Sequence, residues 1–133
     1  NGVLFASGSM WEGVDCAGDI LSSVIIVRLP FPLRSQTMEF KKMSCKNTKE
    51  FVQKYAVPQM IIKLRQGAGR LIRNETDTGV LAILDARAAQ GGVYRTRVLN
   101  TLWKYPLVSS ISDVASFIDS VKNESYKKEV PCG

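Results

Sequence analysis

A glutamine and two arginines in the stretch from Val57 to Arg73 have the types and the spacing to act on a phosphate. On a helix at 100° per residue, Gln66, Arg70 and Arg73 fall within roughly 60° of one another. The sequence between Phe51 and Asn74 contains no acidic residue, so this helix offers its arginines no carboxylate. Two guanidinium groups one turn apart suit a dense anionic target such as a triphosphate. A solvated basic face is the alternative interpretation.

Two glycines, Gly67 and Gly69, flank this polar stripe. Each costs about 1 kcal/mol relative to alanine inside a helix, so we expect the backbone here to approach something closely. This favours the phosphate-facing interpretation. Seven apolar residues fall within roughly 60° of one line on the other side, which is wide enough to pack on a sheet. They are Val57, Met60, Ile61, Leu64, Ala68, Leu71 and Ile72.

A second candidate phosphate contact lies near the start of the chain. Residues 1–6 are predicted to form an apolar strand, and Ser7-Gly8-Ser9 follows it. A strand that enters a serine- and glycine-rich turn leaves backbone N–H groups free to face phosphate oxygens. An ordinary connection between a strand and a helix explains the same pattern equally well.

A third candidate is Asp85-Ala86-Arg87, at the end of a strand predicted over Gly79–Asp85. Open α/β sheets bind ligands at the carboxyl ends of their strands, where these charges are expected to lie. An internal Asp–Arg pair that only fixes the loop is the equally weighted alternative.

The remaining pattern predicts an α/β domain. Ser23–Leu29 is apolar on both faces, as in a central parallel strand, and Pro30-Phe31-Pro32 ends it. Helices are predicted in Gln36–Tyr55 with a break near Cys45–Thr48, from Val57 with Pro58 in the first turn, and over Val93–Trp103. Ser110 and Asp113 have capping-box spacing before a short final helix. Strands separated by helices imply a mainly parallel sheet. We expect one domain over residues 1–122 and a polar tail over 123–133.

Composition narrows the function classes. The chain has 133 residues, 45% of them hydrophobic, with a net charge of +6, three cysteines and no histidine. The charge weakly favours a polyanionic partner. The odd, widely spaced cysteines make a metal site in this chain improbable and fit reduced thiols in a cytoplasmic protein. The apolar runs are too short to span a membrane. Because the chain opens in a strand, we expect a fragment of a longer protein.

Two stretches, GSMWEGVD at 8–15 and QGAGRLIR at 66–73, together carry a family resemblance. They resemble motifs V and VI of the second motor domain of superfamily 2 helicases, most closely the DinG branch related to the xeroderma pigmentosum group D helicase. Leu29-Pro30-Phe31-Pro32 is similar to that family's Leu-Pro-Phe segment, and Asp85-x-Arg87 to an element beyond motif VI. The resemblance implies a RecA-like three-layer sandwich of the P-loop NTPase class.

The resemblance also implies a role for each motif. Gln66, Arg70 and Arg73 would face ATP with Mg²⁺ bound mainly by an absent first motor domain, with both arginines as arginine fingers, and Gly67 and Gly69 lie beside them. Glu12, Gly13 and Asp15 would couple the nucleotide to the nucleic acid. Single-stranded DNA would meet Ser7, Gly8 and Ser9, and Trp11 either stacks on a base or packs internally. Asp85 and Arg87 would support the cleft between the domains.

The chain departs from the whole-helicase pattern in two respects. Leu33-Arg34-Ser35-Gln36 replaces the prolines that usually extend the Leu-Pro-Phe segment. No GxxxxGK[ST] loop and no acidic Mg²⁺-binding motif occurs in the sequence. We therefore expect that this fragment does not hydrolyse ATP alone, and we expect it to be monomeric.

Three functional hypotheses follow. The first is the C-terminal half of an ATP-dependent DNA helicase or translocase that acts in DNA repair. The second is a nucleic-acid-binding module without catalysis, which predicts salt-dependent single-strand binding by the isolated chain. The third, a nuclease or other enzyme with its own site, is disfavoured because the sequence lacks histidine and shows no carboxylate cluster.

Overall fold

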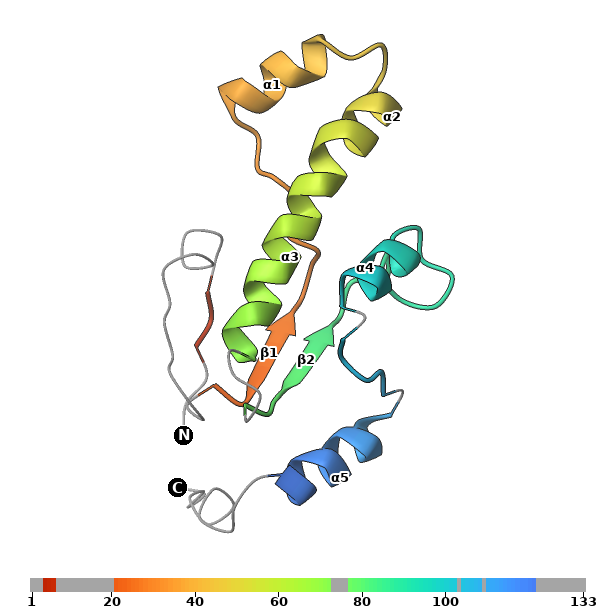
Figure 1. Cartoon of the computed structure of the whole chain (residues 1–133). Helices are drawn as coiled ribbons and strands as arrows, with labels where there is room; N and C mark the ends of the chain where they lie inside the picture. Colours follow the sequence, from red (N-terminus) through yellow and green to blue (C-terminus); the bar gives the residue numbers. More distant parts are fainter. Residues whose placement is uncertain (1–3, 7–20, 73–76, 103, 109, 122–133) are drawn as a thin grey trace.

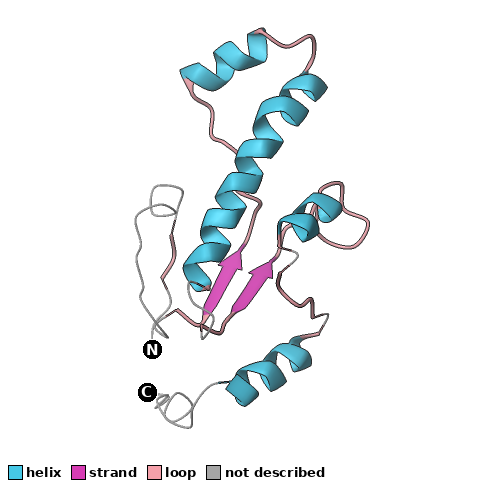
Figure 2. Ribbon diagram, in the orientation of Figure 1, coloured by secondary structure: helices cyan, strands magenta, loops and turns pink. Residues whose placement is uncertain are grey.

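The computed structural model describes residues 4–6, 21–72, 77–102, 104–108 and 110–121 of the chain. In this part, the sheet consists of two short parallel strands, β1 (Ser23–Ile26) and β2 (Val80–Ile83) (Figures 1 and 2). Their register pairs Ser23 with Val80 and Ile26 with Ile83. Both strands lie within predicted segments, and the α/β arrangement with parallel pairing is confirmed. A larger sheet between two helical layers stays a prediction.

The core lies where the long helix α3 (Val57–Leu71) packs against both strands. Met60 and Leu64 have no exposed surface, and Ile26 and Val57 are almost fully buried beside them. The apolar face predicted for this helix is therefore confirmed. α3 runs in the direction opposite to β1, as an element that crosses back before the next parallel strand must (Figure 1).

The helix that contains α3 begins earlier than its sequence pattern predicts. α2 (Thr48–Phe51) passes through a π-helical turn, η2 (Val52–Ala56), directly into α3. The N–H of Val57 donates to the carbonyl of Val52, five residues back, and Pro58 follows. A proline lacks the N–H for an α-helical bond and its ring crowds the preceding turn. The wider π turn accommodates Pro58 within one continuous helix.

The predicted break near Cys45–Thr48 is confirmed, because α1 (Gln36–Met43) ends before α2 begins. Both helices have side-chain caps. Ser35 Oγ accepts the N–H of Met38 at 3.2 Å, and Asn47 Oδ1 accepts the N–H of Glu50 at 2.9 Å. Met38 is the buried residue of α1. α1 and α2 lie beyond the carboxyl ends of the strands, as an arm that extends from the sheet (Figure 1).

Two more helices follow β2. α4 (Arg95–Thr101) is shorter than the predicted helix over Val93–Trp103 and contributes buried Val98 to the core. α5 (Ile111–Val121) begins at the predicted cap, where Ser110 Oγ accepts the N–H of Asp113 at 3.1 Å. None of its described side chains is fully buried.

The strand predicted over residues 1–6 is not found in its described part, residues 4–6. Leu4 is 62% exposed and Phe5 is 91% exposed. An isolated apolar segment gains nothing from extension unless a neighbouring strand pairs with it. β1 and β2 are likewise shorter than their apolar runs. The predicted tail, residues 123–133, lies outside the described residues.

Candidate functional site

The polar side of α3 carries the residues predicted to face a nucleotide. Gln66 is exposed, and Arg70 is half-buried with an interaction partner in the chain. Gly67 is buried, whereas Gly69 is exposed. A methyl group built on Gly69 would meet no atom within 4 Å. The described part of the domain therefore gives no packing reason for a glycine at this position. Arg73 lies outside the described residues.

Asp85 and Arg87 form the best-defined polar cluster in the described part of the chain. Asp85 is 8% exposed and sits directly beyond β2. Its carboxylate accepts the backbone N–H of Leu29 at 2.8 Å and the backbone N–H of Arg87 at 3.0 Å. The Arg87 guanidinium donates to both carboxylate oxygens, with Nη2 at 2.6 Å from Oδ2. Asp85 therefore ties the segments after both strands together.

The electrostatics of this pair follow from those contacts. Hydrogen bonds from the Arg87 side chain hold the pKa of Asp85 well below its usual range, and the Leu29 and Arg87 N–H groups add to this. Burial opposes the shift by penalising the charged form. The carboxylate in turn raises the pKa of Arg87. The guanidinium also lies 4.9 Å above the Phe31 ring, which packs on Tyr94.

A shallow hollow opens beside the pair at the carboxyl ends of both strands. Val27 and Arg28 line it from the β1 side, and Leu84 to Arg87 from the β2 side. Arg28 is exposed. Sequence reasoning missed this arginine. Its signal was a single cation at the end of an apolar strand, directly before Leu29-Pro30.

The structure does not bring the polar side of α3 and the Asp85–Arg87 pair together. Leu71, at the end of α3, packs against Gly79 at the start of the β2 segment. Asp85 lies at the other end of that segment, six residues on, a span of about 20 Å for an extended chain. Arg70 and the Asp85–Arg87 pair therefore occupy opposite ends of the sheet.

The predicted nucleotide-coupling and single-strand contacts lie outside the described residues. These are Ser7, Gly8, Ser9, Trp11, Glu12, Gly13 and Asp15. In the described ranges, no three Cys, Asp or Glu side chains gather closely enough to hold a metal ion. None of the helices formed by the described residues combines the length and the apolar character of a membrane span.

The two parallel strands, with α3 packed against them, form a small α/β unit. The chain belongs to the helicase C-terminal domain family, whose model matches residues 1–105. The predicted resemblance to the DinG branch is confirmed.

Three relatives illustrate this membership. The chain is 39% identical over 98 residues to the 3′-5′ exonuclease DinG of Bacillus subtilis, an alignment that covers 70% of this chain and 10% of that protein. It is 46% identical over 92 residues to the ATP-dependent DNA helicase YoaA of Escherichia coli, covering 65% and 14%. It is 38% identical over 89 residues to the ATP-dependent helicase DinG of Mycobacterium tuberculosis, covering 65% and 13%. The chain thus spans only a small part of each relative's length.

Proposed function

We propose that this chain is the C-terminal motor domain of an ATP-dependent DNA helicase or translocase. Its partner is a first motor domain in the same polypeptide, which binds most of the ATP and Mg²⁺. Membership of the helicase C-terminal domain family and the likeness to two relatives that are named as ATP-dependent helicases support this proposal. The isolated chain does not hydrolyse ATP, because the phosphate-binding loop belongs to the other domain. The RecA-like three-layer sandwich, the monomeric state and the cytoplasmic location belong to the same proposal.

The observation that carries the proposal is the polar side of α3. Gln66 and Gly69 are exposed on a helix whose other side carries the buried core residues Met60 and Leu64. Gly69 faces open space, so a nucleotide on a neighbouring domain can approach the backbone there. Arg70 and Arg73 act as arginine fingers on the γ-phosphate, where charge develops during phosphoryl transfer.

The motif at residues 8–15 couples the bound nucleotide to the nucleic acid. Glu12, Gly13 and Asp15 link the nucleotide state to the nucleic acid. Ser7, Gly8 and Ser9 contact phosphates of single-stranded DNA through backbone and hydroxyl donors, and Trp11 stacks on a base or packs internally. Asp85 and Arg87 support the fold near the strand ends, which is the role that their mutual hydrogen bonds favour.

The test is the DNA-stimulated ATPase activity of the full-length protein. Arg70→Ala and Arg73→Ala are each expected to lower turnover by a factor on the order of 10³, as loss of an arginine finger does. Nucleotide affinity, measured with a fluorescent ATP analogue, should change little.

Arg65→Ala is the matched control, because Arg65 is an exposed arginine on the same helix outside the polar stripe. It should keep parental turnover. Normal ATPase activity in both finger variants would remove the proposed role of these arginines. A full-length parent that binds single-stranded DNA but never hydrolyses ATP would instead support the non-catalytic binding module.

A further inference from the structure

The positive charge of the chain is concentrated in the arm formed by α1 and α2. Residues 34–54, here called the arm, carry six basic side chains and two glutamates, which makes a net charge of +4 in a chain of +6. The six are Arg34, Lys41, Lys42, Lys46, Lys49 and Lys54. All are exposed except Lys41, which is half-buried. The arm is therefore the main basic element of the described domain.

The two carboxylates of the arm offset only part of its basic charge. The Glu50 carboxylate accepts the backbone N–H of Lys46 at 2.7 Å, so it caps α2. Among the described residues, neither Glu39 nor Glu50 forms an ion pair with a lysine. Lys41 and Lys54 lie 5.4 Å from the centre of the Tyr55 ring, which orders two of the cations. A surface of this kind is complementary to a polyanion.

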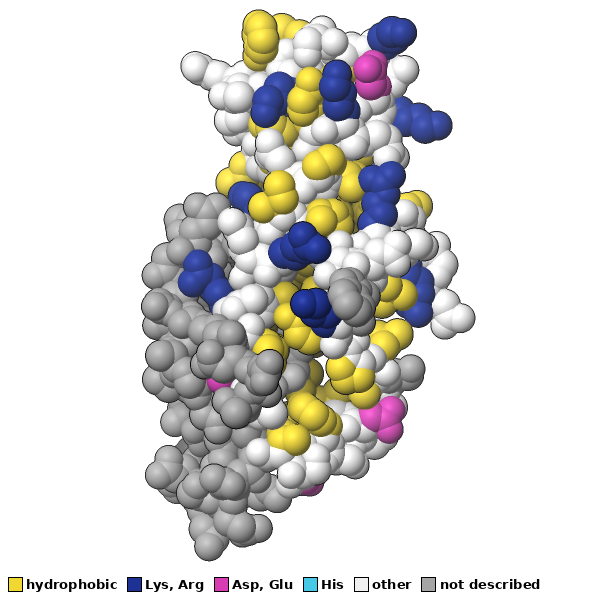
Figure 3. Space-filling view, in the orientation of Figure 1, with side chains coloured by type: hydrophobic (Ala, Val, Ile, Leu, Met, Phe, Trp, Pro, Cys, Tyr) yellow, Lys and Arg dark blue, Asp and Glu magenta, His cyan; other side chains and the backbone are white. Residues whose placement is uncertain are grey.

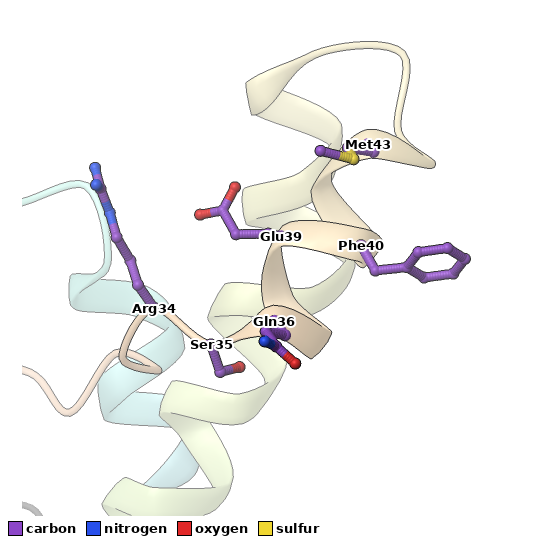
Figure 4. A pocket seen from close by; sticks show the side chains of 6 residues that line it. All are labelled: Arg34, Ser35, Gln36, Glu39, Phe40 and Met43. Carbon is purple, nitrogen blue, oxygen red and sulfur yellow. The ribbon is translucent and has the colours of Figure 1, made fainter.

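Two large, exposed apolar side chains lie on the same helix as Lys41 and Lys42. Phe40 is 75% exposed and Met43 is 82% exposed, one turn apart on α1. The Phe40 ring points away from α1, while Arg34 and Glu39 lie on the opposite side of this helix (Figure 4). These four side chains line a shallow apolar hollow together with Ser35 and Gln36. Basic and apolar side chains alternate over this part of the surface (Figure 3).

We propose that the arm is a second binding surface for single-stranded DNA, with phosphates on Lys42 and Lys46 and a base stacked on Phe40. Single-strand-binding surfaces combine a basic track for the backbone with aromatic rings for the bases. A protein partner of this apolar patch would have to be acidic to match the lysines, whereas DNA supplies both anionic phosphates and planar rings. The inference rests on the proposed function, because it extends the path of the DNA over the motor.

The experiment measures binding of a fluorescein-labelled oligothymidylate to the full-length protein at several salt concentrations. For Lys42→Gln/Lys46→Gln, the slope of log K against log salt should become shallower by about 1.4, since each lost single-strand phosphate contact removes about 0.7. The matched control is Arg95→Gln/Lys104→Gln, which removes one charge at the start of α4 and one three residues after its end, and should keep the parental slope.

A second series isolates the aromatic contact. Phe40→Ala should weaken binding about fivefold or more without changing the salt slope. Phe40→Tyr should retain affinity and Phe40→Leu should lose it, because only an aromatic ring stacks on a base. Phe40 is largely exposed, so these variants are expected to fold.

The outcomes separate the two proposals. A parent that hydrolyses ATP and binds DNA, with arm variants identical to it, overturns this inference and leaves the proposed function intact. Arm variants with parental DNA affinity but an altered sedimentation coefficient would assign the patch to a second copy of the protein and also overturn it. A parent that neither binds DNA nor hydrolyses ATP overturns the proposed function itself.

Discussion

The carboxylate of Asp85 accepts the backbone N–H of Leu29 at 2.8 Å, across 56 positions of sequence. This bond joins the segment after β2 to the segment after β1, just where the strand pairing ends at Ile26 and Ile83. Asp85 thus extends the connection between the strands beyond the ladder by means of a side chain. The stability of this end of the sheet should therefore depend on one buried carboxylate.

Replacing Asp85 should destabilise the protein. Asp85→Ala leaves the N–H of buried Leu29 without its acceptor, which costs about 1–3 kcal/mol in the free energy of unfolding. Arg87→Ala should cost less, because the Arg87 side chain is 45% exposed and water can replace its contacts. Urea denaturation followed by circular dichroism measures both. Equal losses in the two variants would show that the ion pair, rather than the bond to Leu29, carries the stability.

The same carboxylate predicts a dependence of stability on pH. Since its pKa is lowered on folding, Asp85 contributes its full stabilisation above about pH 4, the ordinary pKa of an aspartate. That contribution is lost progressively as the pH falls below this value, because protonation then favours the unfolded chain. The difference in unfolding free energy between the parent and Asp85→Asn should therefore narrow from neutral to acid pH. A difference in unfolding free energy that stays constant with pH would contradict the lowered pKa of Asp85.

Two glycines should respond in opposite ways to alanine. Gly69→Ala should raise stability by about 1 kcal/mol at most, because its methyl group meets open space in a helix. It should nevertheless lower DNA-stimulated ATPase activity if a nucleotide approaches that backbone. Gly92→Ala should instead destabilise the fold, since its methyl group would overlap the backbone carbonyl of Arg87. Thermal melts and ATPase assays on both variants test this, and undiminished turnover in Gly69→Ala would argue against a close approach there.

The two faces of α3 should differ sharply in sensitivity to truncation. Leu64→Ala removes a side chain with no exposed surface and should cost about 2–5 kcal/mol. Ile62→Ala, on the same helix at 56% exposure, should cost much less. Chemical denaturation of the pair provides the comparison. Similar losses would mean that Leu64 does not pack in the core as described.

Sequence periodicity located the central elements well, because burial and helix geometry act locally. The apolar face of α3, the break after α1 and the cap at Ser110 all follow from patterns within a few residues. The start of the long helix was missed, because Pro58 usually opens a helix and only the π turn at η2 lets it lie inside one. The strand predicted at residues 1–6 failed in its described part, because pairing depends on a partner that periodicity does not reveal.

Part of the polar cluster after the strands could be foreseen from the sequence, but its arrangement could not. Asp85 and Arg87 are neighbours in sequence, so their pairing could be foreseen, whereas the reach of Asp85 to Leu29 depends on the register of two distant strands. Arg28 joins the same hollow for that reason. The separation of Arg70 from Asp85 follows from the direction of α3, which a motif pattern does not encode.

The continuous helix from Thr48 to Leu71 also has a mechanical consequence. At 1.5 Å per residue this helix is about 36 Å long, with the arm near one end and Arg70 near the other. A rotation of about 5° about one end would displace the other by about 3 Å over that length. One continuous helix thus links the arm to the segment that carries Arg70.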